Sequence, residues 1–553
     1  MPLLDQLDIT PLDEHFSRLI GRLGGGARVQ EAARYVSAAR GAGHTCLPLG
    51  ELEGGAAAWV GDLRASPVTG APGGWNPLIL DEAGRLYLQR YWRYEQELAA
   101  GIRTRLAAPA TEIDEARLSA AIECLLPSSD ERTADQRRAA AAALRSRFCV
   151  ITGGPGTGKT RTISVILALL AEFSPAPPRV LLAAPTGKAA ARMTEALSQT
   201  TSQAAVTLHR LLGIRPQSAT PWHHAGNPLV ADVVIVDEAS MIDLALMAKL
   251  FAATPPGARL ILLGDRDQLA SVEAGHVLGD ICEAAAHGGA GFHALQRNFR
   301  FSSDSGIQKL SAAVNRGETE AALALLAEPM ENLSGRALPA PGGLAGQLRE
   351  MILQAHRRTM QAASAGEALL VQSAFRILSA IRGGPYGVDH LNRLAESILA
   401  GVIQPAGQHY PGRPIMILQN DYNLGLFNGD VGIVLRNPAD ASELRAYFPA
   451  PGGGVRDIHA ARLPEHETAW AMTVHKSQGS ECDRVLLILP DRDNPVLTRE
   501  LVYTGLTRAR TAAEVWYSAP VLKTAIGRRT VRFSGLRELL GGGRAKLQIP
   551  EIK

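Results

Sequence analysis

Cysteine is scarce in this chain, and the few that occur are scattered. The 553 residues include five cysteines, none of them in a CxxC pair: Cys46, Cys124, Cys149, Cys282 and Cys482. This spacing argues against a zinc site, a four-cysteine iron–sulfur cluster or a disulfide framework. It is typical of a protein that works in a reducing compartment.

Long apolar runs and an excess of one charge are also missing. No stretch approaches the roughly 18 uninterrupted apolar residues of a membrane span. Residues 1–8 carry acids where a signal peptide has basic residues and an apolar run. The formal net charge is only +3, which neither requires nor excludes nucleic acid as a partner. We therefore expect a soluble, cytoplasmic protein of several domains that does not contact a membrane.

What the chain does contain is a strand, a glycine-rich loop and a helix in direct succession. A hydrophobic run over 148–151 predicts a buried parallel strand, and apolar residues at helical spacing follow the loop. The loop fits the pattern GxxxxGKT of a phosphate cradle: Gly153, Gly154, Pro155, Gly156, Thr157, Gly158, Lys159 and Thr160. Its backbone N–H groups and the helix N-terminus favour phosphate. We expect Lys159 to reach the β- and γ-phosphates of a nucleotide and the Thr160 hydroxyl to hold Mg²⁺.

Two further strand-like runs end in polar residues. Four β-branched residues over 233–236 deliver Asp237 and Glu238 to the carboxyl edge of a parallel sheet, where ligands bind in such folds. Asp237 is expected to hold Mg²⁺ through water, and Glu238 to act as general base for the attacking water. Gln268 follows the run over 260–263 and is placed to sense the γ-phosphate.

Adenine recognition has two candidates. Phe299 and Arg300 stand side by side, so that Phe299 is expected to stack on adenine and Arg300 to act as an arginine finger. Gln136, which precedes the phosphate-loop strand, carries an amide able to bond the adenine edge. Taken alone, a surface glutamine is the plainer interpretation of Gln136.

Two loops offer hydroxyl and amide groups to a phosphate backbone. The run over 179–184 predicts a strand that leads into Pro185-Thr-Gly-Lys188 and then a helix. The segment 207–213 is a weaker candidate for the same task. Each of these segments alone would be interpreted as an ordinary loop.

Outside these stretches the sequence predicts organisation rather than chemistry. Short strands separated by turn residues over 402–460 predict a small inserted β-barrel. Residues 1–118 show no catalytic spacing and are interpreted as a docking domain. The aromatic residues over 86–98 share one helical stripe, which favours packing over base stacking. The arginines after residue 520 are interpreted as solvated surface: Arg528, Arg529, Arg532, Arg537 and Arg544.

In order and content, these stretches resemble the motifs of superfamily 1 helicases, and specifically the RecD family, the α subunit of exodeoxyribonuclease V. The resemblance covers about residues 130–520, and the string His475-Lys-Ser-Gln-Gly-Ser-Glu481 is particularly specific. Phe299 stands where relatives often have Tyr. The segments that match motifs I, Ia and II to VI are, in order, Gly153–Thr160, Ala184–Met193, Asp237–Asp243, Gly264–Gly275, Asn298–Arg300, Thr473–Glu481 and Val502–Arg510.

The resemblance implies a role for individual positions. The residues that match the family's ATPase positions are Lys159, Thr160, Asp237, Glu238, Gln268, Arg300 and Arg508. Gln136 and Phe299 match positions that contact adenine, while Gly479 and Glu481 match positions near the γ-phosphate and the ribose. The residues that match single-strand DNA contacts are Pro185, Thr186, Lys188, Thr207, His209, Thr473 and His475.

The implied fold is α/β, with two RecA-like parallel-sheet P-loop domains, a mostly helical N-terminal domain and the small β-barrel insertion. The expected divisions are 1–118 for the docking domain, 119–294 for the first RecA-like domain, 402–460 for the insertion, and 295–401 with 461–553 for the second RecA-like domain.

The implied function is that of an ATP- and Mg²⁺-dependent 5′-to-3′ DNA translocase and helicase. Its expected partners are single-stranded DNA, duplex DNA ends, and RecB-like and RecC-like subunits, with the nuclease site in a partner chain and a role in double-strand break repair and recombination. Two alternatives stay open: a free-standing RecD-like helicase, and a non-motor assembly subunit that binds nucleotide structurally.

Overall fold

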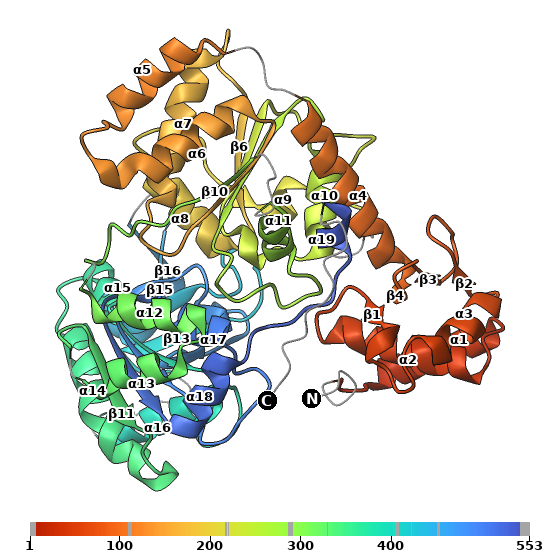
Figure 1. The fold of residues 1–553 in the computed structure, drawn as a ribbon. Helices are drawn as coiled ribbons and strands as arrows, with labels where there is room; N and C mark the ends of the chain where they lie inside the picture. Colours follow the sequence, from red (N-terminus) through yellow and green to blue (C-terminus); the bar gives the residue numbers. More distant parts are fainter. Residues whose placement is uncertain are drawn as a thin grey trace.

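Three lobes make up the computed structural model of the chain (Figure 1). The structure describes residues 7–541 except 109–112, 216–217, 219, 286–290, 303, 329, 402, 404–408, 422 and 451–453. Among these described residues, no helix is long and apolar enough to cross a membrane.

The first lobe is a parallel sheet covered by helices, and it contains the glycine-rich loop. The strand order is β10-β5-β9-β8-β6-β7, and every pairing is parallel. The central strands are apolar along their whole length because helices cover both faces of the sheet. The strands are β5 (Phe148–Thr152), β6 (Val180–Ala184), β7 (Val206–Thr207), β8 (Val233–Val236), β9 (Arg259–Gly264) and β10 (Phe292–Ala294). The helices are α5 (Glu115–Leu125), α6 (Ala134–Arg145), α7 (Lys159–Phe173), α8 (Gly187–Leu197), α9 (Leu208–Leu211), α10 (Leu244–Ala253) and α11 (Val277–Ala285).

The second lobe repeats this architecture with strand order β11-β20-β19-β12-β18, again parallel throughout. Its strands are β11 (Leu333–Ala337), β12 (Phe375–Ser379), β18 (Ala471–Thr473), β19 (Cys482–Ile488) and β20 (Ala509–Tyr517). Its helices are α12 (Gly306–Arg316), α13 (Thr319–Ala327), α14 (Leu344–Met360), α15 (Ala365–Ser373), α16 (Val388–Ala400), α17 (Arg499–Leu506) and α18 (Ala519–Gly527). The predicted pair of RecA-like domains is therefore confirmed.

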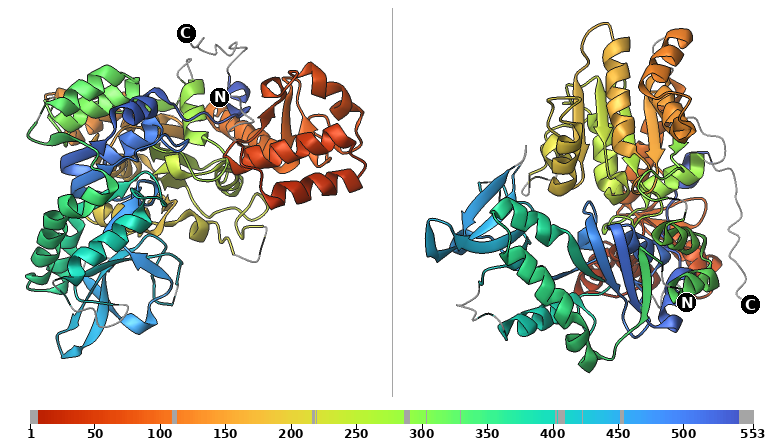
Figure 2. Two further views of the ribbon diagram at one scale, coloured as in Figure 1. Left: turned by 90° about the horizontal axis from the view of Figure 1, so that it is seen from below. Right: turned by 90° about the vertical axis from the view of Figure 1, so that its left-hand side faces the viewer.

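An antiparallel sheet projects from the second lobe (Figure 2). Its order is β16-β15-β14-β13-β17, so the insertion that was predicted as a small β-barrel is present as an antiparallel sheet of five described strands. The strands are β13 (Arg413–Ile417), β14 (Val431–Asn437), β15 (Asp440–Pro449), β16 (Val455–His459) and β17 (His466–Thr468). The last strand thus lies beyond residue 460, the predicted end of the insertion. Parts of the predicted range 402–460 lie outside the described residues.

The N-terminal lobe is mostly helical, as predicted, but also carries a small mixed sheet in the order β1-β4-β3-β2. Its elements are α1 (Pro11–Arg22), α2 (Ala27–Gly41), β1 (Leu47–Pro48), α3 (Ala57–Ala65), β2 (Thr69–Gly70), β3 (Leu78–Leu80), β4 (Arg85–Leu88) and α4 (Gln89–Ala107). The favoured packing role is confirmed for Tyr87, Tyr94 and Leu98, which are buried, but Tyr87 lies in β4 rather than on the helix, and Tyr91 of the predicted stripe is only half-buried. Helix α4 leaves the lobe and packs on α10 of the first parallel sheet.

The C-terminal residues 528–541, here called the C-terminal strap, correct one prediction. The described arginines of this segment are not simply solvated, because the strap runs from the second lobe to the first and ends in α19 (Leu536–Leu539), which packs on α4 and α11 (Figure 1). Arg532 donates to the carbonyls of Gly43 and Glu273 at 3.2 and 2.6 Å. The other three described arginines form ion pairs: Arg528 with Asp493, and Arg529 and Arg537 with Glu283. Arg544 lies outside the described residues.

Glu95 in α4 secures the strap. Its buried carboxylate accepts hydrogen bonds from the Thr45 and Ser534 hydroxyls and from the Gly535 backbone N–H. Glu95→Ala would leave these donors without an acceptor, so we expect the thermal unfolding midpoint to fall by several degrees and residues 528–541 to become protease-sensitive. The exposed Glu97→Ala on the same helix should change neither. An unchanged midpoint and protease pattern in Glu95→Ala would contradict this role.

Candidate active site

The glycine-rich loop joins β5 to α7, as predicted. Gly156 and Gly158 adopt φ angles of 82° and 84°, which glycine tolerates and residues with a Cβ rarely adopt. The loop therefore turns sharply before α7 begins at Lys159. The Lys159 ammonium lies inside the loop and donates to the carbonyls of Gly153 and Gly154 at 2.6 and 3.1 Å.

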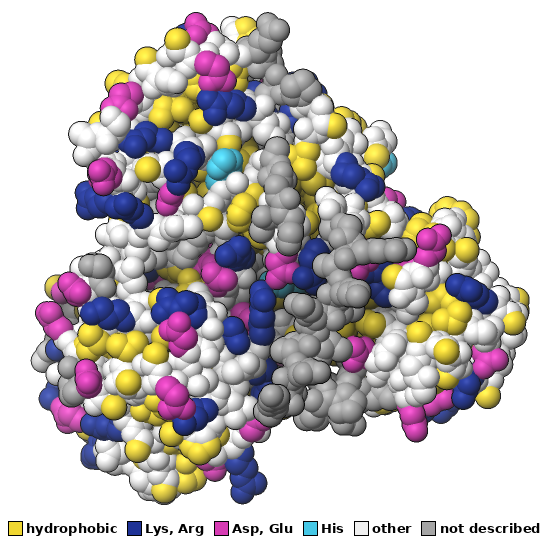
Figure 3. Space-filling model, viewed as in Figure 1, with side chains coloured by type: hydrophobic (Ala, Val, Ile, Leu, Met, Phe, Trp, Pro, Cys, Tyr) yellow, Lys and Arg dark blue, Asp and Glu magenta, His cyan; other side chains and the backbone are white. Residues whose placement is uncertain are grey.

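A cavity of about 390 Å³ opens beside this loop and is lined by both parallel-sheet domains. In Figure 3, acidic and basic side chains lie next to one another along the boundary between these lobes. Predicted residues that line the cavity are Pro155, Gly156, Gly158, Lys159, Thr160, Asp237, Glu238, Gln268, Phe299, Arg300, Gly479, Glu481 and Arg508. The predicted residues Gln136, Gly153, Gly154 and Thr157 are not part of the lining.

The paired acids lie at the carboxyl end of β8. Glu238 has φ 53° and is the one non-glycine residue with positive φ in the described part of the chain. Its backbone N–H donates to Asp237 Oδ1 at 2.8 Å. Burial, and then the neighbouring Glu238, raise the pKa of Asp237 to about 6. A strained backbone of this kind costs of order 1–3 kcal/mol, and such residues cluster at functional sites. The backbone at Glu238 therefore indicates a functional site.

Glu481 connects the two domains within the cavity. Its carboxylate pairs with Arg300, in the segment between β10 and α12, at 2.6 Å and with Arg192 of α8 in the first domain at 3.0 Å. Burial alone would raise the pKa of Glu481, but Arg192, Arg300 and Arg508 hold it at about 2. Arg192 also donates to the Gly479 carbonyl at 2.9 Å. Arg192 was not among the predicted site residues, although it lies on α8 within the segment Ala184–Met193 that matches motif Ia.

Arg508 is almost fully buried, with 2% of its surface exposed. Its guanidinium donates to the carbonyls of Thr504 at 3.1 Å and Ser480 at 3.2 Å, and the side chain reaches the cavity. A buried guanidinium held by two backbone carbonyls is fixed in direction, so it presents a preorganised positive charge to the cavity.

The two adenine candidates lie together beside the loop. Gln136 is buried and its Nε2 donates to the Thr157 carbonyl at 3.3 Å, while its Oε1 has no partner. An ideal Cβ at Gly158 would collide with Gln136 and lie 3.6 Å from the Phe299 ring. The Arg132 guanidinium lies 5.7 Å from the centre of that ring. Gln136 is therefore not a surface glutamine.

The seven predicted DNA-contact residues lie at the ends of the neighbouring strands β6 and β7, at the starts of the helices α8 and α9 that follow them, and around β18 of the second domain. The Thr186 and Thr207 hydroxyls cap α8 and α9 by accepting from the backbone N–H groups of Ala189 and Arg210. A hydroxyl that accepts such a bond keeps its own proton to donate. Pro185 follows β6 directly, Lys188 lies in α8, and Thr473 ends β18.

His475 is half-buried, whereas His209 is exposed at the surface. Nearby protein atoms reduce the hydration of both rings, and this desolvation, together with the Arg532 guanidinium for His475, lowers the pKa of each histidine. Both are therefore neutral near pH 7, so that each would meet a nucleic acid as a hydrogen-bonding or stacking group rather than as a positive charge.

Comparison with known proteins gives two family matches. A family model described as an AAA domain matches residues 136–274, and one described as a UvrD-like helicase C-terminal domain matches residues 468–515. The RecBCD enzyme subunit RecD of Mycolicibacterium smegmatis is 41% identical over 506 residues, covering 87% of this chain and 86% of that protein.

Two further relatives extend this picture. The RecBCD enzyme subunit RecD of Haemophilus influenzae is 36% identical and is matched over 80% of its length and 83% of this chain. The ATP-dependent RecD2 DNA helicase of Deinococcus radiodurans is 34% identical, with 89% of this chain and 65% of that protein covered.

Two parallel-sheet domains that share one cavity, with a phosphate loop on one side and the buried Arg508 on the other, define a two-domain P-loop ATPase. The chain belongs to the RecD family of superfamily 1 DNA helicases. It is accordingly an ATP-dependent DNA helicase.

Proposed function

We propose that the chain moves 5′-to-3′ on single-stranded DNA by closing and opening the cleft between its two RecA-like domains, proposed as 119–294 and 295–553, with the insertion within the second. One observation carries this proposal: Lys159 of the first parallel-sheet domain and Arg508, between α17 and β20 of the second, line the same cavity, together with Arg300. A triphosphate bound there is bonded from both sides, so its cleavage removes bonds that hold the domains together.

Within the cavity, the residues divide the work of hydrolysis. Glu238 takes the proton of the attacking water, while Lys159, Arg300 and Arg508 offset the charge that develops on the phosphates. Phe299 packs on adenine. The unpartnered Gln136 Oε1 accepts a hydrogen bond from the adenine amino group, and Gly479 and Glu481 lie near the γ-phosphate and ribose.

The donor set also fits Mg²⁺. The Thr160 hydroxyl and the Asp237 carboxylate both line the cavity and are the hard oxygen ligands that this ion prefers. No group of three or more His, Cys, Asp or Glu in the described part of the chain could hold a metal, so phosphate oxygens would complete the coordination. Bound there, the ion would neutralise phosphate charge.

Single-stranded DNA is proposed to lie across both domains. On the first domain the contacts are Pro185, Thr186, Lys188, Thr207 and His209, and on the second they are Thr473 and His475. The direct bond from Arg192 to the Gly479 carbonyl connects these two sets to the ATP cavity. Cleft closure would therefore move one set of DNA contacts along the strand relative to the other. When duplex lies ahead, each base-pair step costs about 1.4 kcal/mol of stacking free energy.

Lys188 gives this path a pH dependence. Burial, and then the nearby Arg376, lower the pKa of Lys188 to about 8, with Asp430 acting in the opposite direction. The ammonium is charged below pH 8 and neutral above it, so single-strand affinity is expected to fall severalfold between pH 7 and pH 9. Lys188→Gln should bind single-stranded DNA more weakly at pH 7 and should lose the part of the affinity decrease between pH 7 and pH 9 that comes from Lys188. The exposed Lys523→Gln should keep the wild-type pH dependence. Identical pH profiles for wild type and Lys188→Gln would contradict the contact.

The chain is further proposed to work beside RecB-like and RecC-like subunits, with nuclease chemistry in the RecB-like chain, in double-strand break repair and recombination. The relatives at 41% and 36% identity, named as RecBCD subunits, support this, and they are matched over 86% and 80% of their length. Co-purification with a RecB-like and a RecC-like chain from the native host is expected; recovery as a lone monomer under gentle conditions would favour a free-standing helicase.

The function itself is tested by strand separation on duplexes that carry either a 5′ or a 3′ single-stranded tail. Unwinding that needs ATP, Mg²⁺ and the 5′ tail is expected. Equal unwinding of the 3′-tailed duplex would overturn the polarity, and nucleotide binding without turnover would favour a structural nucleotide.

A further inference from the structure

The Gln268 side chain is held by a chain of three buried residues that crosses the domain boundary. Its Nε2 donates to Asp265 Oδ2 at 3.0 Å, and the Tyr503 hydroxyl of α17 donates to the same oxygen at 3.0 Å. Asp265, Gln268 and Tyr503 are 1%, 3% and 6% exposed, respectively. Asp265 and Gln268 belong to the first domain and Tyr503 to the second.

These contacts fix which end of the Gln268 amide meets the cavity. A carboxylate only accepts hydrogen bonds, so the amide NH₂ group must face Asp265. The Gln268 Oε1 is buried without a partner, and the residue lines the ATP cavity. Gln268 is thus oriented as an acceptor, suited to a proton of the attacking water rather than to a phosphate oxygen.

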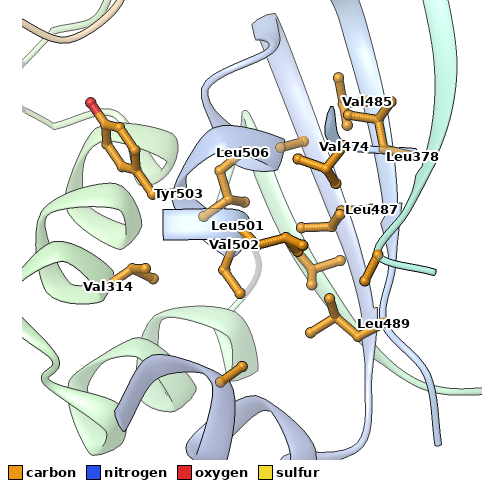
Figure 4. Packing of buried hydrophobic residues seen from close by; sticks show 14 of the residues in the cluster. Val314, Leu378, Val474, Val485, Leu487, Leu489, Leu501, Val502, Tyr503 and Leu506 are labelled. Atoms are coloured by element: carbon orange, nitrogen blue, oxygen red, sulfur yellow. The ribbon is translucent and has the colours of Figure 1, made fainter. Parts of the chain in front are cut away.

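The Tyr503 hydroxyl is a donor in this arrangement. Burial, and then the charge of Asp265, raise the pKa of the Tyr503 phenol far above its usual range, so it keeps its proton at any working pH. Figure 4 shows that Leu501 and Val502 of α17 face Leu487 and Leu489, whereas Tyr503 extends from the other side of the helix.

The hydroxyl also closely approaches the phosphate loop. An ideal Cβ at Gly154 would lie 2.7 Å from the Tyr503 oxygen, so the loop needs glycine at this position. Two neighbouring bonds join the same segments: Leu269 N–H donates to the Thr504 hydroxyl at 3.0 Å, and Gln478 Nε2 donates to the Leu269 carbonyl at 2.9 Å.

Helix α17 therefore delivers two groups at once. Tyr503 reaches Asp265, and Arg508, which follows the end of the helix, bonds back to the Thr504 carbonyl while reaching the cavity. When the second domain moves away, Asp265 Oδ2 loses the Tyr503 donor and keeps only the Gln268 amide, so the carboxylate that holds this amide is less firmly fixed.

We propose that Tyr503 and Asp265 are positioning residues for hydrolysis: Tyr503 fixes Asp265, Asp265 fixes the Gln268 amide, and the Gln268 oxygen orients the attacking water only when the domains are closed. This rests on the proposed function of the cavity. It makes Gln268 sensitive to the position of the second domain, which ties water activation to cleft closure.

The test compares the DNA-stimulated ATPase of four chains: wild type, Tyr503→Phe, Gln268→Ala and the double variant. Tyr503→Phe removes only the hydroxyl, and we expect kcat to fall about tenfold or more with KM for ATP within about twofold. Because Tyr503 acts through Gln268, the double variant should be no slower than Gln268→Ala.

Two further variants sharpen the comparison. Asp265→Asn should also slow turnover at constant ATP affinity. The asparagine amide can donate to Gln268 Oε1, and this bond would turn the Gln268 amide around so that its NH₂ group faces the cavity. Tyr386→Phe removes a hydroxyl bonded at 2.9 Å to the Pro339 carbonyl elsewhere in the second domain, and it should leave kcat unchanged.

The outcomes separate this inference from the proposed function. If Tyr503→Phe keeps the wild-type kcat, or if the kcat losses of the two single variants multiply in the double variant, the positioning role is overturned. The proposed motor function would still stand in either case. Absence of DNA-stimulated turnover in wild type would instead overturn the proposed function itself.

Discussion

Arg508→Ala is expected to lower kcat for DNA-stimulated ATP hydrolysis by about 10³-fold, while the Kd for ATP changes little. The guanidinium is buried, held by the Thr504 and Ser480 carbonyls and presented to the cavity. It is proposed to act on the charge that develops in the transition state, so its loss affects turnover more than binding. Stopped-flow binding of a fluorescent ATP analogue and steady-state turnover would measure the two effects separately.

Two controls accompany this variant. Arg508→Lys keeps the charge but loses the planar fork that satisfies both carbonyls, so turnover should stay low although the fold is kept. Arg484→Ala removes an exposed arginine from β19 and should behave as wild type. A variant with weakened ATP binding and unchanged kcat would contradict the arginine-finger role.

Glu238→Gln is expected to lower kcat by about 10²–10⁴-fold and to leave a chain that still binds ATP. The amide is nearly the same size as the carboxylate but cannot take a proton from water. Because hydrolysis is what opens the cleft, this variant should also hold single-stranded DNA more tightly in the presence of ATP. Fluorescence anisotropy of a labelled strand, with and without ATP, measures this retention.

The exposed Glu195→Gln on α8 is the matched control for this substitution and should retain full turnover. Turnover of Glu238→Gln within about twofold of wild type would show that the general base lies elsewhere. The positive φ of Glu238 makes the glutamine variant preferable to alanine, because it retains the longer side chain in the same strained backbone.

Those parts of the site that depend on a local pattern could be predicted from the sequence. The loop over 153–160 and the acids after β8 follow from a strand that ends in a characteristic polar group. Parallel strands bring their carboxyl ends to one edge, so Lys159, Asp237 and Gln268 were expected to meet. The antiparallel insertion was likewise predicted from its short strands and turns.

The parts that depend on contacts between distant segments could not be predicted in this way. Arg192, Glu481 and Gly479 meet across the domain boundary, and no spacing in the sequence encodes that meeting. The same holds for Tyr503 with Asp265. For the C-terminal strap, a run of arginines is ordinarily solvated, and only the buried acceptors that meet it, such as the Gly43 carbonyl of the N-terminal lobe, reveal its different role.

The account is tested most directly by ATP-driven separation of a 5′-tailed duplex by wild type and Lys159→Gln, with the exposed Lys523→Gln as control. Lys159 is the cation inside the phosphate loop, so its replacement should abolish strand separation and single-strand-stimulated ATPase without loss of fold. Wild type and Lys523→Gln should separate the strands equally. Strand separation by Lys159→Gln at the wild-type rate would contradict the account.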